Sequence, residues 1–286
     1  MSSSLIYCFD TSAINRLLDD PEREPIVKTI LSIGSFRISA YNLLEAAKTK
    51  NANRRSELIK LMWRLCDGKR LLNRPNTILL TYADAHASHE STVVVNADEN
   101  LEGLWVALNQ PKLIDQAAID EILAWAATQE DNFSKIVTGD RDLFQSFFRE
   151  APQDRPRAAA AILRRYLEKE DECHSLIGDI YERRTKKSLS YSEYKVLVNE
   201  PAWALYFLAY AYAIYQRGIR DRNFSERRNA GAIDLGQAVY LTLCDRFVTD
   251  DRPQYRGLRL LNVLNNKRRT QVMQYDTFRS RLLISA

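Results

Sequence analysis

The amino-acid sequence predicts an α/β fold: a parallel sheet sandwiched by helices, with a mostly α-helical insertion. Short apolar runs near both ends of the chain, at 5–9 and 247–249, have the pattern of buried strands and are followed at once by acidic and hydroxyl residues. Between about residues 53 and 225 the apolar spacing is almost entirely helical. We therefore divide the chain into two parts, an α/β core at 1–52 and 230–286 and a helical insertion at 53–229.

The N-terminal part of the core is expected to alternate strands and helices. Residues that favour helix N-caps follow each strand, Asp10 after the first and Ser39 after the second, so each strand should turn directly into a helix. Gly34 should end the helix between them, because glycine favours the position after a last helical turn. The expected elements are, in order, a strand at 5–9, a helix from residue 11, a helix at 26–33, a strand at 36–38 and a helix from residue 40 that carries Glu45.

The middle of the chain is expected to be helical, and its C-terminal part should return to the sheet. The helical candidates are 57–66, 101–108, 114–128, 142–149, 157–170, 174–184 and 192–217. The later elements should be a helix from about residue 231, a strand at 247–249, a helix at 258–264, a strand at 271–275 and a helix at 277–283. Strands joined through helices are what a parallel sheet requires.

Composition limits the class of protein. The 286 residues are 45% hydrophobic and 27% charged, which excludes a disordered or fibrous chain. The four cysteines show no Cys-x-x-Cys spacing, no export signal is visible, and the most apolar stretch, 202–215, is shorter than the ~20 residues that span a bilayer. We expect a cytoplasmic protein with no membrane partner. The net charge of +4 permits a nucleic-acid partner without establishing one.

Acidic residues occupy equivalent positions at four points of the predicted core. They are Asp10 after the first strand, Glu45 in the helix after the second, Asp234 at the start of a helix, and Asp251 after the strand at 247–249. Parallel strands end at one edge of their sheet, where α/β proteins bind ligands, so these acids should converge. Carboxylates suit Mg²⁺ or Mn²⁺, and such an ion can activate a water for attack on a phosphodiester.

This set of acids resembles that of the PIN-domain nucleases. Their pattern is an early Asp-Thr-(Ser/Asn), a Glu about one βα unit later, an Asp at a helix start, and Val-Thr-x-Asp. The matching segments, which fall within 5–50 and 230–284, are Phe9-Asp10-Thr11-Ser12 with Asn15, Asn42-Leu43-Leu44-Glu45-Ala46, Gly231-Ala232-Ile233-Asp234-Leu235 and Val248-Thr249-Asp250-Asp251.

The resemblance implies a metal-dependent endoribonuclease, similar to the toxins of bacterial toxin–antitoxin pairs. It implies that Mg²⁺ or Mn²⁺ is held by Asp10, Glu45, Asp234 and Asp251, with Asp250 beside them. Thr11, Ser12, Asn15 and Thr249 would support these carboxylates. A homodimer and an antitoxin or other regulatory partner are further expectations from the family.

A second segment of the chain is similar to the motif at 248–251. Residues 136–140 read Ile-Val-Thr-Gly-Asp, and Asp120 precedes them by a similar interval, so Asp120 and Asp140 are an alternative to Asp234 and Asp251. We prefer the later pair, because the expected helix, strand and helix of the C-terminal part follow it alone.

Arginines crowd the segment before Asp234 and also follow Asp251. Arg227, Arg228 and Arg252 are the candidate contacts to a phosphate backbone. RNA is the expected substrate. Two alternatives to an endoribonuclease remain: a structure-specific DNA nuclease, and a non-catalytic PIN-like protein that binds RNA or a protein partner. The insertion is compatible with RNA binding, with covering the site, or with binding a regulator.

Overall fold

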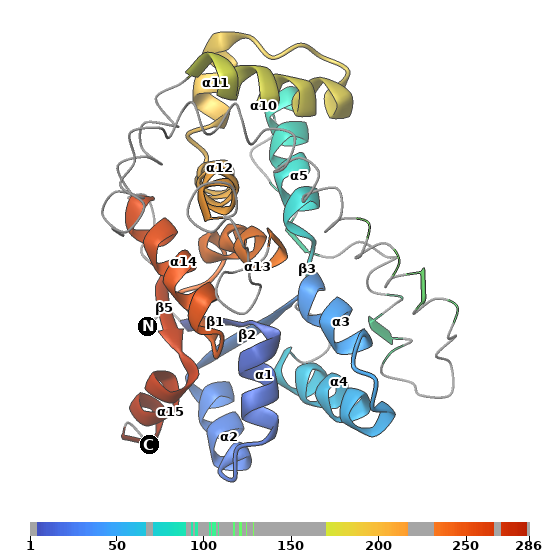
Figure 1. Cartoon of the computed structure of the whole chain (residues 1–286), viewed down its shortest axis with the longest axis vertical. Coiled ribbons are helices and arrows are strands. Elements are labelled where there is room, and N and C mark those ends of the chain that lie inside the picture. Colours follow the sequence, from blue (N-terminus) through green and yellow to red (C-terminus); the bar gives the residue numbers. More distant parts are fainter. Residues whose placement is uncertain are drawn as a thin grey trace.

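The computed structural model of the chain describes residues 5–66, 71–89, 170–216, 232–265 and 270–284, together with single residues between 93 and 128. Five strands of this part form one sheet in the order β3-β2-β1-β4-β5 (Figure 1). All four pairings are parallel, which confirms the predicted α/β class. The strands are β1 (Leu5–Phe9), β2 (Gly34–Ser39), β3 (Leu71–Leu72), β4 (Arg246–Thr249) and β5 (Gln271–Gln274).

The order of the strands reverses beside β1. From β1 the chain builds outward through β2 to β3, and then returns to place β4 on the other side of β1, with β5 beyond it. Phe9 pairs with Val248, and the Asp10 N–H donates to the Val248 carbonyl at 3.0 Å. The carboxyl ends of β1 and β4 therefore lie side by side at the topological switch point, the place where open α/β sheets bind ligands.

Helices flank the sheet on both faces. In the N-terminal part they are α1 (Thr11–Leu18), α2 (Arg23–Ile33), α3 (Ala40–Ala47), α4 (Ala52–Cys66) and α5 (Pro75–Ser88). In the rest of the described chain they are α10 (Glu170–Thr185), α11 (Tyr191–Leu197), α12 (Pro201–Ile214), α13 (Ala232–Gly236), the 3-10 helix η3 (Gln237–Thr242), α14 (Arg252–Leu264) and α15 (Tyr275–Ile284).

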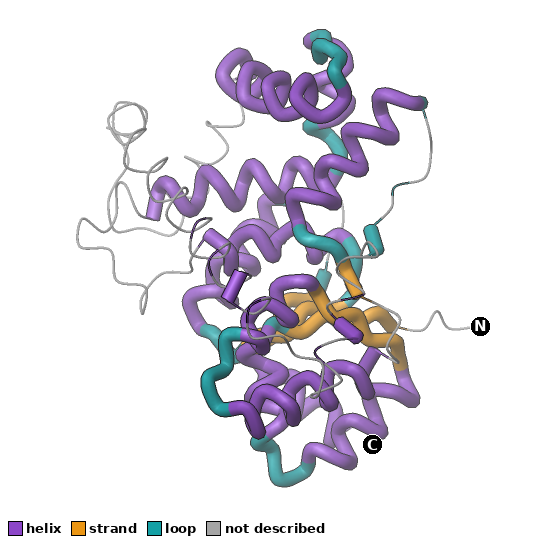
Figure 2. Tube along the Cα trace, turned by 90° about the vertical axis from the view of Figure 1, so that its right-hand side faces the viewer, coloured by secondary structure: helices purple, strands orange, loops and turns teal. Residues whose placement is uncertain are grey.

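Successive side chains of β1 point to opposite faces of the sheet, and the hydrophobic core is accordingly divided into two clusters. Tyr7 and Phe9 pack in one hydrophobic cluster with α1, α2, α3, α4 and α15, whereas Cys8 between them packs in the other with α5, α12, η3 and α14. Figure 2 shows the strands between these two layers of helices. The sandwich follows from the two-residue period of a strand, which sends successive side chains to opposite faces.

The structure differs from the sequence prediction in the middle of the chain. Leu71 and Leu72 pair with Ile38 and Ser39 and form β3, although the sequence predicts no strand there. A two-residue apolar run is too short for its periodicity to distinguish a strand from a helix. From the predicted insertion at 53–229, β3 joins the sheet, α4 packs on β2 and α12 packs on η3, α13 and α14. The division of the chain at residues 52 and 230 stays a prediction.

Prolines explain several differences in the helix boundaries. The helix predicted at 192–217 is two helices, α11 and α12, because Pro201 begins α12 and has no N–H to continue a preceding helix. The helices α2 and α14 begin before the predicted 26–33 and 258–264, since each accepts a proline in its first turn, where no intrahelical N–H bond is lost.

Two further differences concern helix type and coverage. The helix predicted from about residue 231 is α-helical only as far as Gly236 and continues as the 3-10 helix η3. The helices predicted at 142–149 and over most of 157–170 lie outside the described residues. No helix in the described part of the chain is long and apolar enough to cross a membrane.

The contact between β1 and β2 at Gly34 gives a test of the sheet. A Cβ at Gly34 would meet the Leu5 carbonyl oxygen and lie 2.7 Å from Cε2 of Tyr7. We expect Gly34→Ala to lower the free energy of unfolding by about 1–3 kcal/mol, because the two strands must separate to accept the methyl group. Urea denaturation measures this change. Gly178→Ala in α10, where a Cβ meets nothing within 4 Å, is the control and should not be destabilised; equal effects at both glycines would contradict the packing described.

Candidate functional site

The carboxylate of Asp10 lies buried at the switch point. Asp10 follows β1 directly and caps α1, with its Oδ1 accepting the Ala13 N–H at 2.8 Å. The Ser12 hydroxyl lies 2.9 Å from Oδ1 and 2.8 Å from Oδ2. Only 5% of the residue is exposed. The same side chain therefore begins the first helix and places a carboxyl group at the edge of the sheet where open α/β folds bind ligands.

Two hydroxyls connect this carboxylate to the turn that follows β4. Ser12 Oγ accepts the Asp250 N–H at 2.8 Å and donates to Asp10. Thr249 Oγ1 accepts the Asp251 N–H at 3.0 Å and lies 2.9 Å from Asp10 Oδ2, to which it donates. Each hydroxyl thus passes a hydrogen bond from a backbone N–H of one strand end to the carboxylate of the other. We call this pair of connections the hydroxyl relays.

Glu45 reaches the site through α3. This helix begins with a reciprocal capping box between Ser39 and Asn42. The Asn42 side-chain Nδ2 also donates to the Phe9 carbonyl and to Thr11 Oγ1, each at 3.1 Å, so the start of α3 is joined to the end of β1. One turn further along, Glu45 accepts a hydrogen bond from Thr11. Thr11 therefore lies between Asn42 and Glu45.

The charges of the predicted acids act on one another. Burial, with a smaller contribution from the charge of Glu45, raises the pKa of Asp10 to about 8 against the hydrogen bonds from Ala13, Ser12 and Thr249. Burial likewise raises the pKa of Glu45 to about 7. The Thr11 hydrogen bond and Lys48 oppose this rise, whereas Asp234 and Asp251 add to it. The four acids selected from the sequence therefore share one electrostatic environment.

The remaining acids hold different positions around this centre. Asp234 lies half-buried in the first turn of α13, and its carbonyl accepts the Gln254 side chain at 3.5 Å. Asp251 caps α14 by accepting the Gln254 N–H at 2.6 Å. Asp250 is exposed, yet its partial burial raises its pKa, against the opposing charges of Arg16 and Arg252. Within the described residues, no group of three or more His, Cys, Asp or Glu side chains is placed to hold a metal ion.

Other residues predicted for the site lie elsewhere or outside the described part. Asn15 donates to the Thr11 carbonyl, and its Oδ1 accepts from Arg54 rather than contacting any of the four acids. Arg252 is exposed at the start of α14. Asp120 is helical and exposed. Arg227, Arg228 and Asp140 lie outside the described residues, so the alternative use of Asp120 and Asp140 stays open.

Sequence reasoning missed two buried amides that organise the site. Gln254 has no exposed surface, and its Oε1 lies 2.7 Å from the Thr249 hydroxyl oxygen. Asn42 joins β1 to α3 as described above. Each is the third residue of a helix whose cap is Asp251 or Ser39, which is the spacing of a capping box. That spacing was the available signal for both residues.

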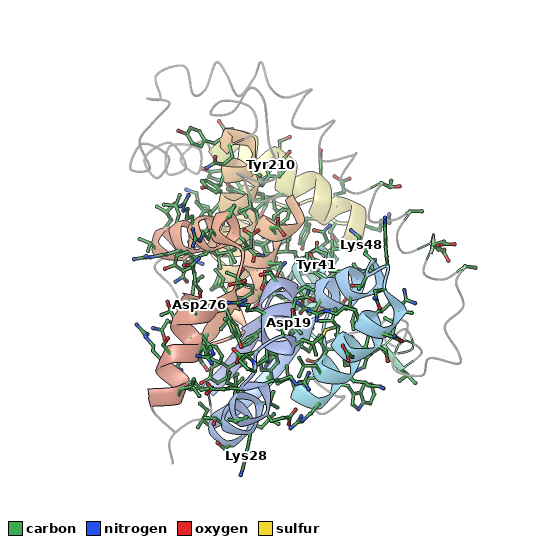
Figure 3. The ribbon with its side chains drawn as sticks, turned by 60° about the horizontal axis from the view of Figure 1, so that its bottom comes forward. Asp19, Lys28, Tyr41, Lys48, Tyr210 and Asp276 are labelled. Atoms are coloured by element: carbon green, nitrogen blue, oxygen red, sulfur yellow. The ribbon has the colours of Figure 1, made fainter. Side chains whose placement is uncertain are left out.

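Figure 3 shows where the labelled side chains lie around these helices. Tyr41, on the same helix as Glu45, lies near the middle of the molecule, whereas Lys28 on α2 lies at its lower end in this view. Comparison of the chain with family models, with curated proteins and with solved structures found no match.

Substitution of Thr249 tests the contribution of the hydroxyl relays to stability. We expect Thr249→Val to lower the free energy of unfolding by about 1–3 kcal/mol, because the Asp251 N–H loses its acceptor and Asp10 loses a donor in a buried place. Thr249→Ser keeps the hydroxyl and should recover most of that loss. Urea denaturation of the three proteins measures it. Equal stability of the Val and Ser variants would show that the hydroxyl contributes nothing.

The raised pKa values predict how stability depends on pH. The folded protein binds protons at Asp10 and Glu45 more tightly than the unfolded chain, whose carboxyls titrate near pH 4. The free energy of unfolding in EDTA should therefore fall as pH rises from about 4 to about 8, and this loss should be complete above the folded pKa values.

Asp10→Asn should remove the share of this loss that Asp10 causes. Asparagine remains a good N-cap, so we expect a melting temperature about 3 °C or more above that of the wild type at pH 8.5, and little difference at pH 4. Asp19→Asn is the matched control on the same helix. The pKa of Asp19 is lowered by its hydrogen bond to Arg54, so this change should not stabilise the protein at pH 8.5. An Asp10→Asn protein that melts below the wild type at pH 8.5 would contradict the prediction.

Proposed function

We propose that the chain is a PIN-like, metal-dependent phosphodiester hydrolase that cleaves RNA. The observation that supports it best is the buried Asp10 carboxylate at the switch point of a parallel sheet, within the field of Glu45. The charges of Asp234 and Asp251 in turn raise the pKa of Glu45, so four acidic side chains lie near one another at one edge of the sheet. Such a concentration of acids is costly unless a cation binds there.

The donor chemistry of the site fits Mg²⁺ or Mn²⁺. Each hydroxyl has one hydrogen to donate, so Ser12, Thr249 and the Ala13 N–H fill at most three of about four acceptor positions on the Asp10 carboxylate. At least one position remains for a cation. Mg²⁺ usually keeps several waters and binds through one or two carboxylates, which suits acids that are near one another without forming a close group of three.

Asp10 and Glu45 would hold the ion, with Asp234 and Asp251 adding negative charge around it. When bound, the ion would lower the pKa of a water and stabilise charge on the phosphate. The chain's own contribution is positional. The hydroxyl relays fix the Asp10 carboxylate, and Thr11 orients Glu45.

Cleavage of labelled single-stranded RNA and DNA with Mg²⁺ or Mn²⁺ tests this proposal. We expect RNA to be cut, EDTA to abolish cutting, and Asp10→Asn and Glu45→Gln each to slow it at least about 100-fold, because each removes a charge that the reaction uses. Asp19→Asn changes an exposed acid of the same helix that is paired with Arg54, and should retain full activity.

Other results of this cleavage assay would indicate other functions. Cutting of DNA alone would replace the proposal by a DNA nuclease. RNA binding without cutting of either polymer would favour a non-catalytic regulator. Cutting that survives both Asp10→Asn and EDTA would exclude this site as the source of activity. An antitoxin partner, a homodimer and a cytoplasmic location belong to the same proposal and are separate questions for co-purification, mass measurement and cell fractionation.

A further inference from the structure

A cation follows the outer strand at the same edge of the sheet. β3 runs parallel to β2, so its carboxyl end also faces the edge where the acids gather. The two residues after β3 are Asn73 and Arg74, and α5 begins at Pro75. Arg74 is therefore the counterpart on β3 of the acidic residues that follow β1 and β4.

The backbone that carries Arg74 is held firmly by Asn73. The Asn73 carbonyl accepts the Tyr240 hydroxyl at 2.9 Å, and its own N–H donates to the Val95 carbonyl at 3.0 Å. The Asn73 side chain accepts the Arg74 N–H at 2.9 Å. A backbone held on both sides in this way fixes the point from which the arginine extends, which is what a binding residue needs.

Helix stability does not explain an arginine at this position. Arg74 is the N-cap of α5 and makes no capping hydrogen bond with its side chain. N-caps favour Asp, Asn, Ser and Thr, and the helix dipole makes a cation unfavourable at a helix N-terminus. Departures from local sequence rules are expected at functional positions. Capping therefore does not account for the arginine at this position.

Tyr41 connects Arg74 to the acidic centre. The pairing of Ser39 with Leu72 places Tyr41 and Arg74 two residues beyond the same point on adjacent strands. Tyr41 also precedes Glu45 by four residues on α3, so the two share a helix face. A Cβ on Gly236, two residues after Asp234, would lie 3.8 Å from the Tyr41 hydroxyl.

The charges agree with this placement. Burial is the main cause that raises the pKa of Tyr41, and the nearby Tyr206 raises it further. The charge of Arg74 lowers the pKa and that of Glu45 raises it. The Tyr41 hydroxyl therefore stays protonated and lies within the influence of both the cation and the acid. It is a neutral hydroxyl near both.

We propose that Arg74, together with the Tyr41 hydroxyl, binds the RNA phosphate next to the one that is cleaved. This inference rests on the proposed function and names the part of the substrate that the site recognises. A guanidinium matches two oxygens of one phosphate, and a phenol adds a third hydrogen bond. The site then selects a polynucleotide over a single nucleotide, because only a polynucleotide supplies the neighbouring phosphate.

Binding of RNA in the absence of metal is the first test. The protein is Asp10→Asn in EDTA, the probe is a fluorescein-labelled single-stranded RNA oligonucleotide, and the readout is anisotropy over a range of salt concentrations. Arg74→Gln in this background should weaken affinity about ten-fold and reduce the slope of log K against log salt by about 0.7, the share of one phosphate contact. Arg74→Lys should restore the slope and part of the affinity.

Lys28→Ala is the matched control, since it removes an exposed charge from α2 at the lower end of the view in Figure 3, away from Tyr41. Its affinity and slope should not change, and urea denaturation should show that all variants are folded. Equal affinity and slope for Arg74→Gln and its parent would overturn the inference, as would failure of the parent to bind RNA.

A chemical change in the substrate separates this inference from the proposed function. An RNA with a neutral methylphosphonate beside the cleaved bond should be cut by the wild type about ten-fold more slowly in kcat/KM than the natural RNA. Arg74→Gln should cut the natural RNA about ten-fold more slowly than the wild type, and should lose nothing further with the methylphosphonate. If the two losses multiply, the phosphate is not the partner of Arg74. If the wild type cuts no RNA, the proposed function fails, and the binding test alone decides the role of Arg74.

Discussion

The carboxylate of Asp10 is the constraint on which the rest of the site depends. A carboxylate removed from water costs several kcal/mol unless hydrogen bonds replace its hydration, and here the donors come from α1 and from the end of β4. The Thr249 hydroxyl is 239 positions away from Asp10 in the sequence. The site can therefore form only when the two ends of the chain have come together in the sheet. A change that disrupts the sheet would also disrupt the site.

The hydroxyl relays also explain why the turn after β4 takes its particular shape. Ser12 and Thr249 each accept one backbone N–H of the turn and donate to the same carboxylate, and hydrogen bonds in such a series polarise and strengthen one another. Gln254 closes the network on the far side, since it bonds to Thr249 and reaches the Asp234 carbonyl. A movement of α13 relative to α14 would therefore change the hydrogen bonds of Asp10 through the buried side chains of Gln254 and Thr249.

The sequence predicted those features whose cause is local. β1 and β4 are short buried runs followed by capping residues, and that local pattern placed Asp10 and Asp251 correctly at strand ends. β3 has only two residues, and it is a strand because β2 offers an open edge beside it, which no local pattern records. The roles of Asn42 and Gln254 likewise depend on neighbours that other segments supply. Their spacing from a cap was visible, but the partners across the sheet were not.

The arrangement of charge along the sheet edge indicates a direction for a bound polymer. The acids follow the central strands β1 and β4, and Glu45 follows β2 through α3, whereas the cation Arg74 follows the outer strand β3. Adjacent strands lie about 4.8 Å apart, so the ends of β1 and β3 are separated by about 10 Å. A polyanion is repelled by the acids until a cation neutralises them, and is attracted to the arginine at all times. A strand of RNA lying across the edge, at right angles to the strands of the sheet, would meet both regions with successive phosphates. The same strand lying along β1 would meet only the acids, so the crossed orientation is the one that the charges favour.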